Sequence, residues 1–124
     1  MDRGIITISE NGTVSMPAIP VWMTQYEIAD ALGVFGCEIR KAIRAIYKNN
    51  ELLESETMRY IRQDNRINYD VYSLEMVTAI AFRIRSREAK AFRKFIMTRL
   101  YTDDRNKPVC LFFSLTDTNP QCTC

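Results

Sequence analysis

The sequence predicts an α+β fold, and three observations lead to this class. Residues 24–46 carry two short helical patterns around a glycine turn. Residues 58–62 and 67–72 are alternating segments on either side of a polar stretch, as in a β-hairpin. Two further helical patterns fill residues 73–100. Together with a first hairpin near the N-terminus, these elements predict a winged helix-turn-helix with an N-terminal β-hairpin and a C-terminal helix pair.

The length sets the domain organisation. With 124 residues the chain can form one compact domain and is too short for two ordinary ones. We assign residues 1–100 to the winged helix-turn-helix domain. Residues 101–124 form a C-terminal tail to which the sequence assigns no role.

The N-terminal hairpin is expected from residues 5–8 and 13–16, which flank an Asn11-Gly12 turn. Both turn residues accept the positive φ that a tight hairpin turn requires. Pro17 and Pro20 end the hairpin because neither can donate a ladder hydrogen bond.

The first helix begins at a capping box, in which Thr24 and Glu27 satisfy each other's backbone amides. Its predicted buried stripe is Ile28, Ala29 and Leu32. Ala29 has to be small because the second helix crosses over it, and Gly33 is placed to end the helix in a left-handed conformation.

The second helix is expected over residues 37–47, with one apolar and one basic face. Spacings of three and four place four apolar residues on the side that faces the core: Ile39, Ala42, Ile43 and Ile46. The opposite side carries four cations: Arg40, Lys41, Arg44 and Lys48. Asn49 and Asn50 indicate its end.

The remaining core is expected from the last two helices. Ser73 is predicted to cap a helix that continues to Ile84, and Ser86 a helix that continues to Leu100. Between the second helix and the second hairpin, residues 51–56 read as an acidic connector.

The charge distribution favours an anionic partner. Residues 35–100 hold 14 Lys or Arg against 8 Asp or Glu, a net charge of +6, whereas the rest holds 3 against 7, a net charge of −4. In a helix-turn-helix the second helix enters the DNA major groove, where arginine can bridge two acceptors of guanine and lysine acts as a point charge on phosphate. The candidate DNA-binding residues of this helix are Gly36 and Cys37 at its start, then Arg40, Lys41, Arg44 and Lys48.

The second hairpin supplies three more candidate DNA-binding residues, Arg59, Arg62 and Arg66, which suit a wing that grips flanking phosphate or the minor groove. Two alternatives remain open. The hairpin arginines can be simply solvated, and a helix pair with a glycine turn can be a plain packing unit.

Several classes of function are disfavoured by what the sequence lacks. It contains no histidine, the commonest general base and metal ligand, and no paired carboxylates or phosphate loop, so we expect no enzyme and no cofactor. Its four cysteines, Cys37, Cys110, Cys122 and Cys124, lack the spacing of a structural zinc site, and free thiols are the expectation over a metal held with an outside ligand. The apolar runs are short and no signal peptide is recognisable, so we expect no membrane contact and a cytoplasmic location.

The chain from Val21 to Leu100 resembles the RhuM family of bacterial virulence-associated proteins. The resemblance lies in Val21-Trp22-Met23-Thr24-Gln25, in the segment 28–34, in the segment 71–84 and in Arg87 to Leu100 with Phe92-Arg93-Lys94-Phe95. It implies a DNA-binding or regulatory role related to phage-type antirepressor domains, with no catalytic residue and no cofactor. The second helix departs from the expected pattern, because Phe35-Gly36-Cys37-Glu38 stands where a Ser/Thr-rich start is typical.

The sequence therefore predicts a homodimeric, sequence-specific binder of double-stranded DNA that regulates transcription. The family resemblance implies that the regulated genes belong to a mobile or phage-like element. The alternative is a protein-interaction module that uses the same scaffold, like an antirepressor, without direct DNA binding.

Overall fold

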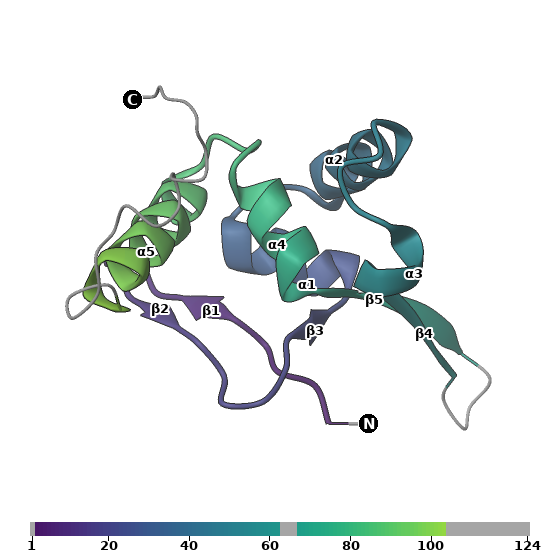
Figure 1. Ribbon diagram of the computed structural model, residues 1–124, viewed down its shortest axis with the longest axis horizontal. Helices are drawn as coiled ribbons and strands as arrows, with labels where there is room; N and C mark the ends of the chain where they lie inside the picture. Colours follow the sequence, from purple (N-terminus) through teal and green to yellow (C-terminus); the bar gives the residue numbers. More distant parts are fainter. Residues whose placement is uncertain (1, 63–66, 104–124) are drawn as a thin grey trace, which may run out of the picture. The chain divides into compact units, whose positions relative to one another are not determined.

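The computed structural model describes residues 2–62 and 67–103. These residues form five helices and two small antiparallel sheets, which confirms the mixed α+β class (Figure 1). The chain divides into two units, Met1–Lys94 and Phe95–Cys124. The first unit holds every element up to the first half of the last helix, α5 (Arg87–Asp103).

The predicted N-terminal hairpin is present as β1 (Thr7–Ile8) and β2 (Val14–Ser15), which pair antiparallel. The prediction for its turn is wrong in detail. The Ser9 amide donates to the Thr13 carbonyl at 2.9 Å, so the loop has three residues, and of these only Gly12 has a positive φ, 86°. A three-residue loop needs one left-handed position, not two.

The second sheet has three strands in the order β3-β5-β4, all antiparallel: β3 (Trp22–Met23), β5 (Asn68–Ser73) and β4 (Met58–Arg62). The predicted second hairpin is thus confirmed as β4 and β5. The inner end of β5 is buried and its outer end is largely exposed. Figure 1 shows β4 and β5 extending away from the helices as a ribbon.

Helices α1 (Gln25–Leu32) and α2 (Gly36–Lys48) form the predicted helix pair. The capping box is present, because the Thr24 hydroxyl accepts from the Glu27 amide at 3.1 Å and the Glu27 carboxylate accepts from the Thr24 amide at 2.7 Å. Gly33 ends α1 with φ 69°, in the left-handed region as expected. Only the three residues from Gly33 to Phe35 therefore separate α1 from α2.

The crossing of α1 and α2 is close-packed. Ala29 is 6% exposed, and the predicted apolar stripe of α2 is buried in full. The core of the first unit also includes side chains from the N-terminal segment, from α1, from the three-stranded sheet and from both C-terminal helices: Ile6, Met23, Ile28, Leu32, Val71, Met76, Val77, Ile80, Ala89 and Phe92.

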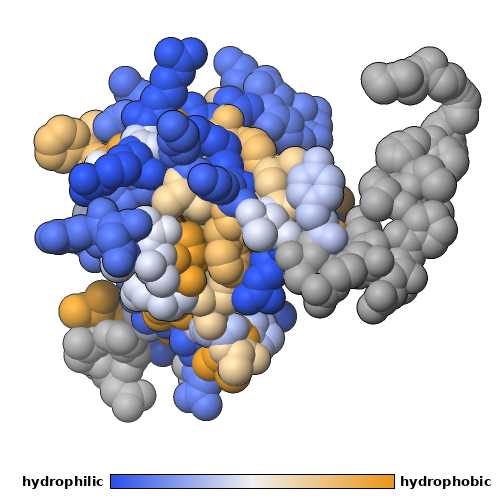
Figure 2. Space-filling model, turned by 90° about the vertical axis from the view of Figure 1, so that its left-hand side faces the viewer, coloured by the Kyte–Doolittle hydropathy of each residue, from blue (hydrophilic) through white to orange (hydrophobic). Residues whose placement is uncertain are grey.

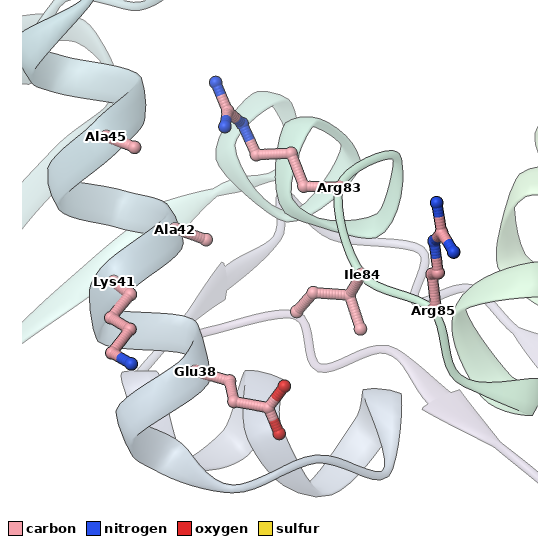
Figure 3. A pocket seen from close by; sticks show the side chains of 7 residues that line it. All are labelled: Glu38, Lys41, Ala42, Ala45, Arg83, Ile84 and Arg85. Atoms are coloured by element: carbon pink, nitrogen blue, oxygen red, sulfur yellow. The ribbon is translucent and has the colours of Figure 1, made fainter.

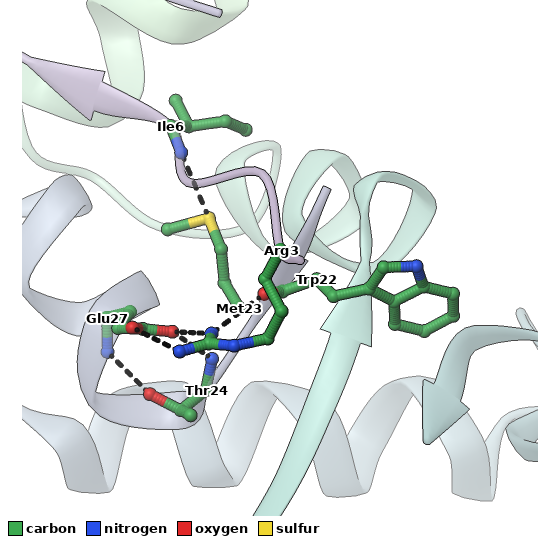
Figure 4. A network of polar contacts seen from close by, with 6 residues as sticks. All are labelled: Arg3, Ile6, Trp22, Met23, Thr24 and Glu27. Atoms are coloured by element: carbon green, nitrogen blue, oxygen red, sulfur yellow. Dashed lines mark hydrogen bonds and ion pairs between the residues drawn. The ribbon is translucent and has the colours of Figure 1, made fainter. Parts of the chain in front are cut away.

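The N-terminal segment is attached to α1 by an ion pair that the sequence did not reveal. Arg3 grips the Glu27 carboxylate with both terminal nitrogens, at 2.6 and 3.2 Å, and also donates to the Trp22 carbonyl at 3.0 Å (Figure 4). Burial alone would raise the pKa of Glu27, but the Arg3 hydrogen bond and the Thr24 amide outweigh it and lower the pKa. The same carboxylate thus closes the capping box and anchors the N-terminal segment.

Gly4 passes between neighbouring backbone segments next to this ion pair. Its amide donates to the Pro20 carbonyl at 2.9 Å, and its carbonyl accepts from the Trp22 amide at 3.2 Å. A Cβ at this position would lie 2.5 Å from the Ile19 carbonyl oxygen and 2.8 Å from that of Pro20. The crossing therefore has no room for a side chain.

The C-terminal helices differ from expectation at their ends. Helix α4 (Leu74–Ala81) stops before Ile84, which is buried in the segment that follows. Ser73 stands at the N-cap, but its hydroxyl donates to the Glu75 carboxylate instead of capping an amide. Ser86 does cap α5, because its hydroxyl accepts from the Ala89 amide at 3.0 Å.

Hydrogen bonds from α5 explain the early end of α4. The Arg93 side chain donates to the carbonyls of Ala81 and Ile84, at 2.7 and 2.9 Å, which satisfies the end of α4 and allows the chain to leave the helix early. The acidic connector is also more ordered than expected, since residues Glu54–Thr57 form the short helix α3.

The first testable prediction concerns the helix crossing. Ala29→Glu is expected to lower the free energy of unfolding by several kcal/mol, because it places an unpaired charge between α1 and α2. Urea denaturation followed by circular dichroism measures the loss. Ala18→Glu is the matched control, since Ala18 is exposed, and an equal loss in both variants would contradict the assigned crossing.

The second prediction concerns pH. Because folding lowers the pKa of Glu27, the ion pair stabilises the fold above the carboxyl's unfolded pKa, and this stabilisation is lost as the pH falls through the folded pKa. Arg3→Ala is expected to cost about 2 kcal/mol at neutral pH, the scale of hydrogen bonds to charged groups. The difference from the parent should shrink as the pH falls below about 4, close to the ordinary pKa of glutamate. Denaturation at a series of pH values tests this, and a constant difference would contradict it.

Candidate nucleic-acid interface

The predicted cations of α2 form one exposed surface, which we call the cationic face: Arg40, Lys41, Arg44 and Lys48. All four are exposed, and none makes an ion pair or hydrogen bond with another residue of the described ranges. Figure 2 shows another side of the molecule, the left-hand side of Figure 1, where hydrophilic residues also cover much of the upper part. Uncompensated cations on one helix face are the footprint expected of an anion-binding surface.

Contacts at both ends hold α2 in place. At its start, the Gln25 side-chain amide donates to the Gly36 carbonyl at 3.0 Å. Near its end, the hydroxyls of Tyr47 and Thr57 lie 2.8 Å apart, and Thr57 donates to the Leu53 carbonyl at 2.8 Å. Burial raises the pKa of Tyr47, which keeps this hydroxyl protonated as a hydrogen-bonding group. The cationic face is therefore presented by a helix that is fixed at both ends.

The first residues of α2 lie beside two exposed aromatic rings. Gly36 is half-buried, and a Cβ there would lie 3.6 Å from the Tyr26 ring. Cys37 is exposed and is a free thiol. Phe35, the N-cap residue, makes no side-chain capping bond and is 78% exposed. The leading end of α2 therefore presents apolar and small groups, while the cations follow along its length.

The hairpin arginines Arg59 and Arg62 do not form one cationic cluster in the structure. Arg59 and Arg62 are both exposed on β4, but they are three residues apart and so project from opposite faces of the strand. The Arg59 guanidinium lies 4.3 Å from the centroid of the Trp22 ring on β3, a cation–π contact. Arg66 lies outside the described residues. The structure thus gives Arg59 a partner within the domain.

A hollow of about 530 Å³ runs along the flank of α2, and we call it the α2 groove. One wall is α2 and the other is the segment between α4 and α5 (Figure 3). Its lining residues are Glu38, Lys41, Ala42, Ala45, Arg83, Ile84 and Arg85. Lys41 belongs both to this groove and to the cationic face, so the two surfaces are continuous.

Several residues that shape this region were not singled out from the sequence. Gln25, Tyr47 and Thr57 act through hydrogen bonds between separate elements, which periodicity does not reveal. Arg83 falls within the helix that the sequence predicts up to Ile84, and Arg85 directly follows it. Their position beside α2 depends on where α4 ends, and the sequence pattern extended that helix too far.

The described residues contain neither a metal-binding cluster nor a membrane-spanning helix. In residues 2–62 and 67–103, no three acidic or cysteine side chains gather closely enough to hold a metal ion. Cys110, Cys122 and Cys124 lie outside these ranges, so the expectation that they bind no metal stays a prediction. Within the same part of the chain, no helix combines the length and apolar character that a bilayer crossing requires.

A third testable prediction follows from the Arg59 contact. Trp22 is the single tryptophan of the chain, and it is 8% exposed. Arg59→Ala is expected to change its fluorescence emission and to lower the free energy of unfolding by about 0.5–1 kcal/mol, the size of an exposed cation–π contact. Arg62→Ala, on the opposite face of β4, is the matched control and should leave the Trp22 emission unchanged. Identical spectra for the parent and Arg59→Ala would contradict the contact.

Comparisons of the chain with protein-family models, with curated proteins and with solved structures found no match. The resemblance to the RhuM family accordingly stays a prediction from the sequence.

Proposed function

We propose that this protein binds double-stranded DNA in a sequence-specific manner, as a winged helix-turn-helix regulator of transcription. In this proposal α2 is the recognition helix, α1 supports it, and β4 and β5 form the wing. The regulated genes would belong to a mobile or phage-like element, which is what the resemblance to the RhuM family implies. The proposal includes no catalytic residue and no cofactor.

The observation that carries the proposal is the division of α2 into two faces. One face is buried against the core, and the other offers four cations without a partner among the described residues. A surface helix needs a polar outer face, but an ordinary one intersperses both signs of charge, and the only acidic residue of α2 is Glu38. Arg40 and Arg44 are the residues proposed to read guanine, because arginine can donate two parallel hydrogen bonds to that base.

The order of the elements along the chain also supports a winged helix-turn-helix. Two helices joined by a short turn are followed by an antiparallel hairpin, and β3 extends the sheet on the other side of β5. With α2 in the major groove, such a hairpin reaches the neighbouring backbone. A homodimer is part of the proposal, since two-fold symmetry would match two half-sites on the duplex.

A protein-interaction module is the second candidate, and the exposed aromatic rings at the start of α2 favour it. Tyr26 is 74% exposed and Phe35 78%, and aromatic residues are enriched in protein interfaces. Salt dependence separates the two functions. DNA binding weakens steeply with salt because counterions are released, whereas an apolar contact does not.

The fourth testable prediction concerns the cationic face. Replacing Arg40, Lys41 and Arg44 together by alanine is expected to abolish selective binding to a duplex chosen from a random DNA pool. If one of the arginines reads a guanine, its single alanine variant should lose about 1–3 kcal/mol and relax the preference at one base pair. Fluorescence anisotropy at several salt concentrations measures both effects.

The control removes the same charge from another helix. Arg87, Lys90 and Lys94 are exposed on α5, and their triple alanine variant should retain selective binding. Circular dichroism verifies that both triple variants are folded. If the α2 variant still binds the selected duplex as tightly as the parent, the proposed function of α2 is wrong.

A further inference from the structure

The α2 groove has a charged rim and a small apolar floor. Lys41, Arg83 and Arg85 contribute three cations to it, against one carboxylate from Glu38. The floor is made by Ala42, Ala45 and Ile84, of which Ala42 and Ile84 are buried. Figure 3 shows Ile84 pointing toward α2 from the segment that follows α4. The groove therefore combines an excess of positive charge with space next to the helix.

The two arginines on the far wall are held differently. Arg83 forms an ion pair with Glu51, which follows the end of α2. Arg85 is exposed and makes no ion pair or hydrogen bond with any residue in the described ranges. Arg83 is therefore fixed beside the groove, while Arg85 keeps all its donors available for a ligand.

The shape of DNA indicates which anion would occupy this groove. An α-helix nearly fills the width of the major groove, so a sugar-phosphate strand passes along each side of it. On the Lys41 side of α2, that strand would meet the α2 groove. Alanines on this flank leave room for the backbone, and arginines on the opposite wall can reach its phosphates.

We propose that the α2 groove holds one sugar-phosphate strand of the bound duplex, with Arg85 and Arg83 as phosphate contacts opposite Lys41. This inference rests on the proposed function and adds two DNA-contacting residues from outside the helix pair. Contacts on the far wall fix the depth and angle at which α2 enters the major groove. They carry no base preference of their own.

The fifth testable prediction uses the full chain and a fluorescein-labelled duplex of mixed sequence, with anisotropy recorded over a salt series. Arg85→Ala is expected to weaken binding to all duplexes alike and to make the slope of log affinity against log salt shallower by about one unit. The matched control is Lys90→Ala, which removes one positive charge from an exposed residue of α5 that lies outside the groove. This control should change the affinity and the salt slope less than Arg85→Ala does.

A second variant tests whether removing a negative charge from the groove raises the affinity for DNA. Glu38→Gln removes the carboxylate that lines the groove and is expected to raise the affinity, because a phosphate strand would no longer be repelled. Unfolding cannot produce a gain in affinity, so this result separates an electrostatic role from a structural one.

The possible results have distinct meanings. If Arg85→Ala and Glu38→Gln bind as the parent does while the α2 triple variant fails to bind, α2 contacts DNA but the groove does not, and the inference is overturned. If the parent binds no duplex, the proposed function and the inference both fail. If a poly-glutamate peptide binds the parent and the duplex does not, the groove takes an acidic protein segment, which also overturns the inference.

Discussion

The close crossing of α1 over α2 is the constraint on which the rest of the structure depends. It requires a small residue, Ala29, at the contact and a left-handed residue, Gly33, at the turn. Once the crossing is set, the buried stripe of α2 has only one side on which to pack, and its cations are forced outward. The position of the cationic face is therefore a consequence of core packing.

Much of this region could be predicted because its signals are local. The capping box at Thr24, the glycine end of α1 and the apolar spacing of α2 each lie within one or two helical turns. The alternation of β4 and β5 is local in the same way. Such patterns can be recognised in the sequence because the residues that interact are close together in the chain.

The features that escaped prediction join distant parts of the chain. Arg3 pairs with Glu27 across 24 residues, and Ser86 donates to the Leu32 carbonyl across 54. The end of α4 is set by Arg93, a residue of the next helix. No spacing rule connects such pairs, so the α4 boundary and the α2 groove beside it were not apparent.

Six arginines of the first unit fall into two populations, while Arg83 and Arg87 form ion pairs with Glu51 and Glu88. Arg3, Arg59 and Arg93 have carbonyls, a carboxylate or an aromatic ring as partners, and they stabilise the fold. Arg40, Arg44 and Arg85 have no ion pair or hydrogen bond among the described residues. Net charge alone does not distinguish these populations. The close passage of Gly4 between backbone carbonyls also has an evolutionary consequence. Homologues that keep this crossing should keep glycine at position 4, whereas no such packing constraint acts on the exposed cations.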